Sequence, residues 1–255
     1  MQAEMRVDKS MILLVALKNQ NMPREDIMDI IEAIRTRRSI RAFKPDPIPK
    51  KVLEELLDVC RWAPSGGNTQ PWHFAVLGGK LLDEVTVRLE EKAKTSWDGN
   101  NYTDTNPDLP RKGPYPAFLI PRQQSLRALM DSVRYPPGTK DLEAKQLENR
   151  AKSLRFFDAP NAIIIYADDS SPTAIEAMGI LSQTICLAAL AHGLGTCIMG
   201  MPVLWPELFR ELLSIPEDKP IVISIAIGYP DFEAPINTFP RPREPLVNLV
   251  EWQGL

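Results

Sequence analysis

Residues 173–192, TAIEAMGILSQTICLAALAH, are apolar on nearly every face of the helix that they predict. A stretch of about 20 residues is long enough to cross a bilayer as a helix. Glu176, Gln183 and His192 interrupt the stretch, however, and its many small residues are typical of a helix packed inside a protein. We therefore expect this helix to lie in a core or in a subunit interface, and not in a membrane.

Three short apolar runs have the character of β-strands. Residues 161–168 (NAIIIYAD) and 221–229 (IVISIAIGY) are rich in β-branched side chains and predict buried strands. Residues 72–77 (WHFAVL) lie between a proline and two glycines and predict a third strand. Further helices are predicted at 24–36, 49–62, 80–94, 121–133, 141–156 and 205–213. Because strands and helices alternate irregularly, we expect an α+β fold with one sheet between helices.

Length and composition fit one domain. A chain of 255 residues, of which 44% are hydrophobic, can bury one full core, and no internal repeat or linker divides it. We expect this domain over residues 23–255, preceded by an N-terminal extension, 1–22. The apolar run 11–17 (MILLVAL) in that extension is too short to span a bilayer, and no A-x-A-like cleavage site follows it. We therefore do not expect a signal peptide.

An excursion from this domain is expected at about residues 96–140, where the sequence becomes polar and rich in proline and turn residues. Long loops inside compact domains are uncommon and often act as lids or binding segments. The alternative is a disordered surface insertion. The lid is favoured by the aromatic residues in the segment, which are Trp97, Tyr102, Tyr115 and Phe118.

The number and spacing of the cysteines and histidines argue against a disulfide framework or a metal site. Cys60, Cys186 and Cys197 show no CxxC spacing, and the chain has only two histidines. We therefore expect no metal site, and reduced thiols in a cytoplasmic protein. No acid or histidine is placed beside Cys197 by the sequence, so we expect a packing thiol there and not a nucleophile.

Positive charge is concentrated in residues 35–43, RTRRSIRAF, although the net charge of the chain is −3. That net charge argues against a general nucleic-acid binder, so any anion site must be local. Guanidinium groups and a hydroxyl suit a phosphate, although arginines also favour the C-terminal end of a helix. A second pair of arginines lies in the proline-stiffened segment PRPRE, where alternate residues of an extended chain project to the same side. The candidate phosphate ligands are Arg37, Arg38, Ser39, Arg41, Arg241 and Arg243.

Residues 63–72, APSGGNTQPW, predict a loop with exposed backbone and amide groups, which suit the edge of a planar heterocycle. Gly66 and Gly67 permit a close approach of backbone to ligand. An ordinary turn between a helix and a strand would have a similar composition. Residues 193–200, GLGTCIMG, are glycine-rich but lack the lysine of a P-loop and follow a helix, so they form neither a P-loop nor a dinucleotide-binding turn.

Together these motifs resemble the nitroreductase family of FMN-dependent NAD(P)H oxidoreductases. The resemblance rests on IIEAIRTRRSIRAF, APSGGNTQPWHF, FFDAPNAIIIYAD, GLGTCIMG and the R-x-R near the C-terminus. It covers about residues 26–250, with 96–140 only loosely matched. It implies a single central, mainly antiparallel sheet flanked by helices, in a homodimer that exchanges its C-terminal arms and binds two FMN molecules at the interface.

The resemblance also implies roles for individual residues. The phosphate and ribityl chain of FMN would contact Arg37, Arg38, Ser39, Arg41, Arg241 and Arg243. The isoalloxazine ring would be lined from the other subunit by Pro64, Ser65, Gly66 and Asn68. Backbone at Ile198, Met199 and Gly200 would face the ring edge that bears N5. No catalytic side chain is expected, because the flavin carries the redox chemistry.

The activity implied is transfer of hydride from NADH or NADPH, through flavin N5, to a nitroaromatic, a quinone or a similar electron-poor small molecule. One alternative is a specialised flavoenzyme of the same fold, either a reductive dehalogenase or a flavin-destroying enzyme. Another is a flavin-binding protein without turnover. In a dehalogenase, Arg111, Lys112 and Arg122 would hold an acidic substrate, although a solvated loop explains these three residues equally well. Neither a nucleic-acid nor a membrane partner is expected.

Overall fold

The computed structural model describes residues 29–97, 102–109 and 116–254, in two compact units, 1–37 and 38–255. In the first unit, α2 (Ile30–Thr36) begins after Asp29, whose carboxylate accepts hydrogen bonds from the backbone of the first turn at 2.7 and 3.1 Å. The predicted helix 24–36 is therefore confirmed over its described part. The predicted extension 1–22 lies outside the described residues.

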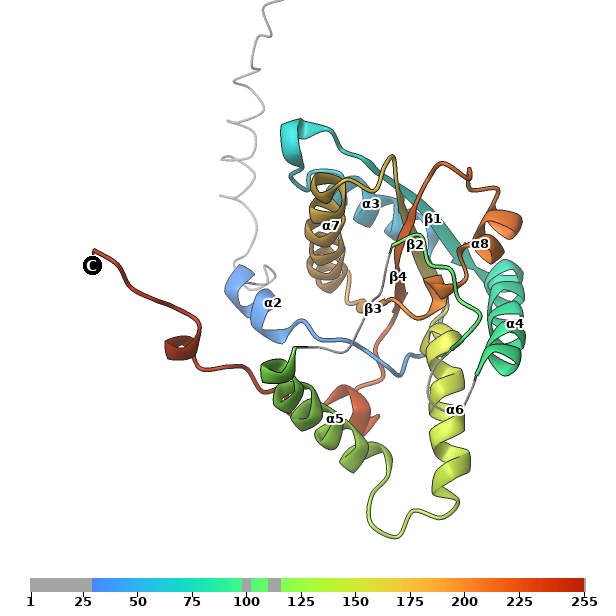
Figure 1. Cartoon of the computed structure of the whole chain (residues 1–255), viewed down its shortest axis with the longest axis vertical. Coiled ribbons are helices and arrows are strands. Elements are labelled where there is room, and N and C mark those ends of the chain that lie inside the picture. Colours follow the sequence, from blue (N-terminus) through green and yellow to red (C-terminus); the bar gives the residue numbers. More distant parts are fainter. Residues whose placement is uncertain (1–28, 98–101, 110–115, 255) are drawn as a thin grey trace, which may run out of the picture. The chain divides into compact units, whose positions relative to one another are not determined.

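The second unit is built on a four-stranded sheet, shown in Figure 1. Its order is β1-β2-β4-β3, and every neighbouring pair is antiparallel. The strands are β1 (Trp72–Gly78), β2 (Asn161–Ala167), β3 (Gly195–Met199) and β4 (Ile221–Gly228). The expected α+β class with one antiparallel sheet is confirmed. The strand β3 was not predicted, because five residues between glycines carry no recognisable alternation.

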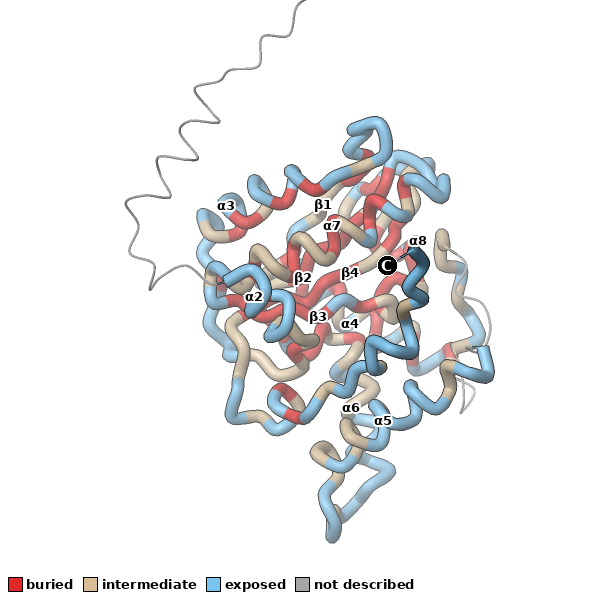
Figure 2. Tube along the Cα trace, turned by 90° about the vertical axis from the view of Figure 1, so that its left-hand side faces the viewer, coloured by how far each residue is buried: buried red, intermediate tan, exposed pale blue. Residues whose placement is uncertain are grey.

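Helices cover both faces of the sheet. On one face α3 (Lys50–Cys60) and α7 (Pro172–Ala191) pack on one buried cluster that includes Ile163 and Ile165. On the other face α4 (Gly79–Ser96) and α8 (Pro206–Leu213) pack on a second cluster that includes Ile164. The run of isoleucines in β2 is thus continuous because that strand is buried on both faces. Figure 2 shows this burial concentrated in the strands and on the inner sides of the helices.

By length and composition alone, the helix α7 is long and apolar enough to cross a membrane. Of its most apolar 18 residues, 44% are buried within the molecule. Its first turn is capped by Ser171, whose hydroxyl accepts from the backbone of Ala174 at 3.2 Å. Met178, Leu181 and Ile185 lie on one face and are buried against the sheet. This packing is that of a core helix, which is one of the two places predicted for it.

Two further helices follow α4 in the sequence and precede β2. They are α5 (Ile120–Arg134) and α6 (Leu142–Leu154). Short 3-10 turns occupy Gly66–Asn68, Ala117–Leu119, Phe156–Asp158, Pro202–Leu204, Pro235–Asn237 and Leu246–Asn248.

One described stretch of the excursion, 102–109, is bound to the core. The indole of Trp205 donates to the carbonyl of Asp104 at 2.6 Å. The carboxylate of Asp108 accepts from Arg210 and from the backbone N–H of Ile221, both at 2.7 Å. These contacts tie the segment to α8 and to the start of β4. Arg111, Lys112 and Tyr115 lie outside the described residues, so a substrate lid stays a prediction.

Replacing Asp108 by alanine should lower the free energy of unfolding by roughly 2 kcal/mol. The change leaves the N–H of Ile221 without its acceptor and takes one carboxylate from Arg210. The loss should be smaller than for a fully broken buried pair, because Arg210 keeps Glu217 at 3.3 Å and the carbonyl of Lys219 at 3.2 Å. Urea unfolding followed by circular dichroism measures the change, and Asp218→Ala is the control; an equal loss in both variants would contradict the prediction.

Candidate functional site

The arginine-rich strip, defined here as residues 38–44, lies along the outer margin of the sheet beyond β3. Ser39 forms a parallel bridge with Thr196, and the N–H of Ile40 donates to the carbonyl of Thr196 at 2.9 Å. Gly195 is required here, because a Cβ at that position would lie 2.6 Å from a side-chain carbon of Ile40. The N–H of Lys44 donates to the carbonyl of Tyr229 at 2.8 Å. The strip is therefore held as an extended segment at a fixed place on the sheet.

The C-terminal tail, defined here as residues 230–254, packs over this strip through Asn237, which is fully buried. Its side-chain oxygen accepts from the N–H of Arg41 at 2.7 Å. Its amide nitrogen donates to the carbonyls of Ala42 and Asp231, each at 2.7 Å. One side chain thus satisfies three backbone groups and joins the strip to the tail. The sequence analysis did not single out Asn237, because an asparagine in a loop gives no sign of long-range contacts.

Arg38 is held by the same tail. It donates from Nη2 to the carbonyl of Phe239 at 2.7 Å, and its guanidinium lies 5.4 Å from the centre of the Phe239 ring. Its Nε is buried and has no partner among the described residues. Burial, and secondarily the charge of Arg41, lower the pKa of Arg38. A buried guanidinium with a spare donor and a cationic neighbour is a site that an anion would stabilise.

Arg134, in the last turn of α5, adds a third guanidinium to this region. Its side chain is only 14% exposed, and its Nε is buried without a hydrogen-bond partner in the described part of the chain. Burial lowers the pKa of Arg134, and the nearby charge of Arg41 lowers it further. Its ion pair with Asp131 is long, at 4.0 Å. The sequence analysis missed Arg134, because only the tertiary fold brings the end of α5 to the strip.

Cys197 lies on β3 beside these cations. Burial raises the pKa of its thiol, despite the opposing influence of Arg41 and Ser39. A buried thiol with a raised pKa is a poor nucleophile. This agrees with the predicted packing role. Cys60, between α3 and α7, behaves in the same way, since burial raises its pKa to about 12.

The outer edge of β3 is the part of the site predicted to face a ring. Along a strand, the backbone N–H and carbonyl of every second residue point to the same side. The carbonyl of Thr196 points to the strip, so the N–H and carbonyl of Ile198 also point outward, away from β4. The side chain of Ile198 is 41% exposed. Met199 is buried, and its carbonyl accepts from the hydroxyl of Ser224 at 2.8 Å. Of the three predicted residues, therefore, Ile198 offers the outward backbone groups, and Gly200 follows it at the partly exposed end.

The predicted loop Pro64, Ser65, Gly66 and Asn68 lies elsewhere in the unit. It is a tight turn in which Gly67 and Asn68 have φ values of 58° and 56°, and the hydroxyl of Ser65 accepts from the N–H of Gln70 at 2.9 Å. Gly66 packs against Thr173, at the first turn of α7. The strip lies beyond the other end of α7, a helix of 20 residues and thus about 30 Å long. One chain therefore does not bring this loop to the arginines, and its role in a partner's site stays a prediction.

The remaining predicted arginines are Arg37, Arg241 and Arg243. Arg37 is the C-cap residue of α2 and belongs to the first unit. Arg241 is partly buried in the tail, whereas Arg243 is exposed and donates to the carbonyl of Pro242 at 2.9 Å. Beyond them Glu244 pairs with Arg122 of α5 at 3.0 Å. This ion pair gives Arg122 a structural partner.

Comparisons with known proteins agree with this geometry. The model of the nitroreductase family matches residues 34–229. The nitroreductase NfnB of Mycolicibacterium smegmatis is 31% identical over 87% of this chain and 93% of the relative. The 4-nitrobenzoate reductase of Pseudomonas putida is 28% identical over 89% of this chain and 96% of its own. A crystal structure of the FMN-dependent nitroreductase NfnB from Mycobacterium smegmatis in complex with NADPH superposes with a TM-score of 0.78, at 26% identity, over 88% of this chain and 100% of that one. This chain belongs to the nitroreductase family.

Proposed function

We propose that this protein is an FMN-dependent oxidoreductase that uses NADH or NADPH to reduce nitroaromatic compounds, quinones or similar electron-poor small molecules. The observation that carries the proposal is the convergence of Arg38, Arg41 and Arg134 beside β3, where the buried Nε atoms of Arg38 and Arg134 have no acceptor among the described residues. Such a set of cations is unfavourable alone and favourable around an anion.

The residues present fit the phosphate of FMN. A phosphate supplies oxygen acceptors for the buried Nε atoms of Arg38 and Arg134. Ser39 adds a hydroxyl on the same strip, and Arg241 and Arg243 follow in the tail that closes over it. No dinucleotide-binding glycine turn accompanies these cations, which favours a mononucleotide. When bound, FMN would supply the hydride and electron chemistry.

The contribution of the chain is binding and orientation. The strip and the tail fix the anion, because Asn237 locks one against the other. The outward backbone of Ile198 offers a donor and an acceptor to the edge of a planar ring. The cations beside β3 also favour negative charge near that ring, which is the electrostatic means by which a protein tunes a flavin.

The choice of substrate class rests on the relatives. One is named as a 4-nitrobenzoate reductase, and the similar crystal structure is of a nitroreductase with NADPH. Nitroaromatic reduction is therefore favoured over dehalogenation or flavin destruction. A binding protein without turnover is the remaining alternative.

The protein is proposed to act as a cytoplasmic homodimer with exchanged C-terminal arms. Apolar side chains of the tail are exposed in the single chain and need a covering surface: Leu246, Val247, Leu249 and Trp252. A second copy would also bring the loop 64–68 to the strip. The three cysteines are free and buried, as expected in a reducing compartment.

The purified protein is expected to be yellow and to release FMN, not FAD, on denaturation, as chromatography of the supernatant will show. Anaerobic addition of NADH or NADPH should bleach the flavin absorbance, and a nitroaromatic acceptor should restore it. Restoration only by a halophenol would favour a dehalogenase. A flavin that is never bleached would indicate a binding protein, and recovery of FAD or of no flavin after reconstitution would overturn the proposal.

A further inference from the structure

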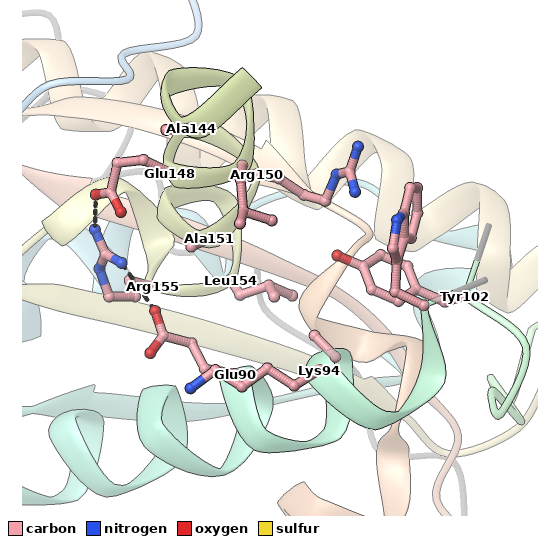
Figure 3. Close-up of a pocket in the computed structure, with 12 residues that line it drawn as sticks. Glu90, Lys94, Tyr102, Ala144, Glu148, Arg150, Ala151, Leu154 and Arg155 are labelled. Atoms are coloured by element: carbon pink, nitrogen blue, oxygen red, sulfur yellow. Dashed lines mark hydrogen bonds and ion pairs between the residues drawn. The ribbon is translucent and has the colours of Figure 1, made fainter. Parts of the chain in front are cut away.

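A cavity of about 550 Å³ lies between α4 and α6, and Figure 3 shows the side chains around it. This volume is within the range of small-molecule sites. Most of the lining surface is apolar, and Ala93, Leu147 and Leu154 contribute to it. The aromatic rings of Trp97 and Tyr102 close one end, with their centres 5.0 Å apart.

The acidic groups of the cavity already have partners. Glu90 and Glu148 each accept from Arg155 at 2.8 Å, at the end of the cavity away from the rings (Figure 3). Arg155 also donates to Asp158 at 2.8 Å. These carboxylates are thus engaged in a fixed network and would not attract a cationic ligand strongly.

The donors at the aromatic end have no such partners. The guanidinium of Arg150 lies 3.6 Å from the centre of the Trp97 ring and, within the described ranges, makes no ion pair. Lys94 also lines the cavity, but its side chain extends toward Glu90 at the other end (Figure 3). Burial raises the pKa of Tyr102, so its hydroxyl stays protonated and able to donate. An apolar wall beside a guanidinium and a phenol is complementary to an apolar molecule with an anionic end.

The cavity is separate from the flavin site proposed above. Its lining includes no residue of the strip, of β3 or of the tail. The helix α6 lies between the two, because Ser153, on this helix, donates to the sulfur of Met201, just beyond β3, at 3.1 Å. A molecule in the cavity would therefore not contact the flavin.

We infer that the cavity between α4 and α6 is a second small-molecule site, which binds a planar aromatic carboxylate with its ring beside Trp97 and Tyr102 and its carboxylate on Arg150. Neither family membership nor the proposed flavin chemistry assigns a ligand here. The inference does not depend on the redox activity.

Calorimetric titration of the flavin-loaded protein with 2-naphthoate tests the inference. The uncharged analogue 2-naphthylmethanol has a ring of the same size and should bind at least about 10-fold more weakly. Arg150→Gln should weaken naphthoate binding by about 10- to 100-fold and leave the binding of the alcohol nearly unchanged. Lys152→Gln is the matched control, since it removes one positive charge from an exposed position of α6. Its effect should stay within about 2-fold.

A filling variant separates the cavity from other sites. Ala151→Phe places a ring in the cavity and should abolish naphthoate binding, with the flavin spectrum and the thermal midpoint as checks on the fold. Three results would overturn the inference: no naphthoate binding up to about 5 mM, equal losses in Arg150→Gln and Lys152→Gln, or binding that survives Ala151→Phe and perturbs the flavin absorbance.

Discussion

Asn237→Leu is expected to lower the free energy of unfolding by roughly 3–9 kcal/mol and to abolish retention of FMN. Leucine keeps the branching of asparagine at Cγ, is somewhat larger, and has none of its polar atoms. The change therefore leaves the N–H of Arg41 and the carbonyls of Ala42 and Asp231 buried without their partner. Each such group costs about 1–3 kcal/mol. Because the same bonds lock the strip against the tail, the anion site should open as well.

Urea unfolding measures the stability, and fluorescence of released flavin measures retention. Asn248→Leu is the matched control, because Asn248 is an exposed asparagine of the same tail whose side chain, among the described residues, donates only to Glu244, at 2.6 Å. It should change the stability by no more than about 0.5 kcal/mol. Similar losses in the two variants would show that Asn237 has no special role.

A truncated variant that ends at Pro235 tests whether the tail is also needed for the dimer. The cut removes Asn237, Phe239, Arg241 and Arg243 together with the exposed apolar end of the tail. We expect the loss of both flavin and dimer. A monodisperse dimer that still binds FMN, seen by light scattering, would show that the arm is dispensable.

The elements that the sequence predicted are those whose burial can be read from the apolar pattern of consecutive residues. The isoleucines of β2 predicted a buried strand, and the apolar stretch 173–192 predicted a helix in a core or in a subunit interface. In both, the pattern of burial follows directly from consecutive residues. The prediction succeeded because packing and sequence periodicity coincide there.

The missed features depend on contacts between distant segments. β3 is only five residues long, and its place at the sheet edge is set by β4 and by the strip. Asn237 and Arg134 resemble ordinary loop and helix-end residues, and become part of the site only when the tail and α5 fold against residues 38–44. Composition identified the cationic motif, whereas the third guanidinium required the tertiary structure.

Arg38→Met and Arg134→Met are each expected to weaken FMN binding by about 10- to 100-fold, the loss of one charge-assisted hydrogen bond. Methionine keeps an unbranched apolar stem, so the change isolates the guanidinium from its packing. Arg127→Met is the matched control, because Arg127 is an exposed arginine on the same helix as Arg134. Its effect on flavin affinity should be negligible. The measurement is fluorescence titration of the apoprotein with FMN.

Arg134→Met should also separate a binding role from a structural one. In the apoprotein, Arg134 is a buried cation close to Arg41, and its lowered pKa reflects that burial and repulsion. Removing its charge should therefore leave the thermal midpoint of the apoprotein unchanged or raise it. In the presence of FMN the order should reverse, because a ligand stabilises the folded state in proportion to the logarithm of its affinity. A variant that is less stable without flavin and binds it as tightly as the parent would instead make Arg134 a packing residue of α5.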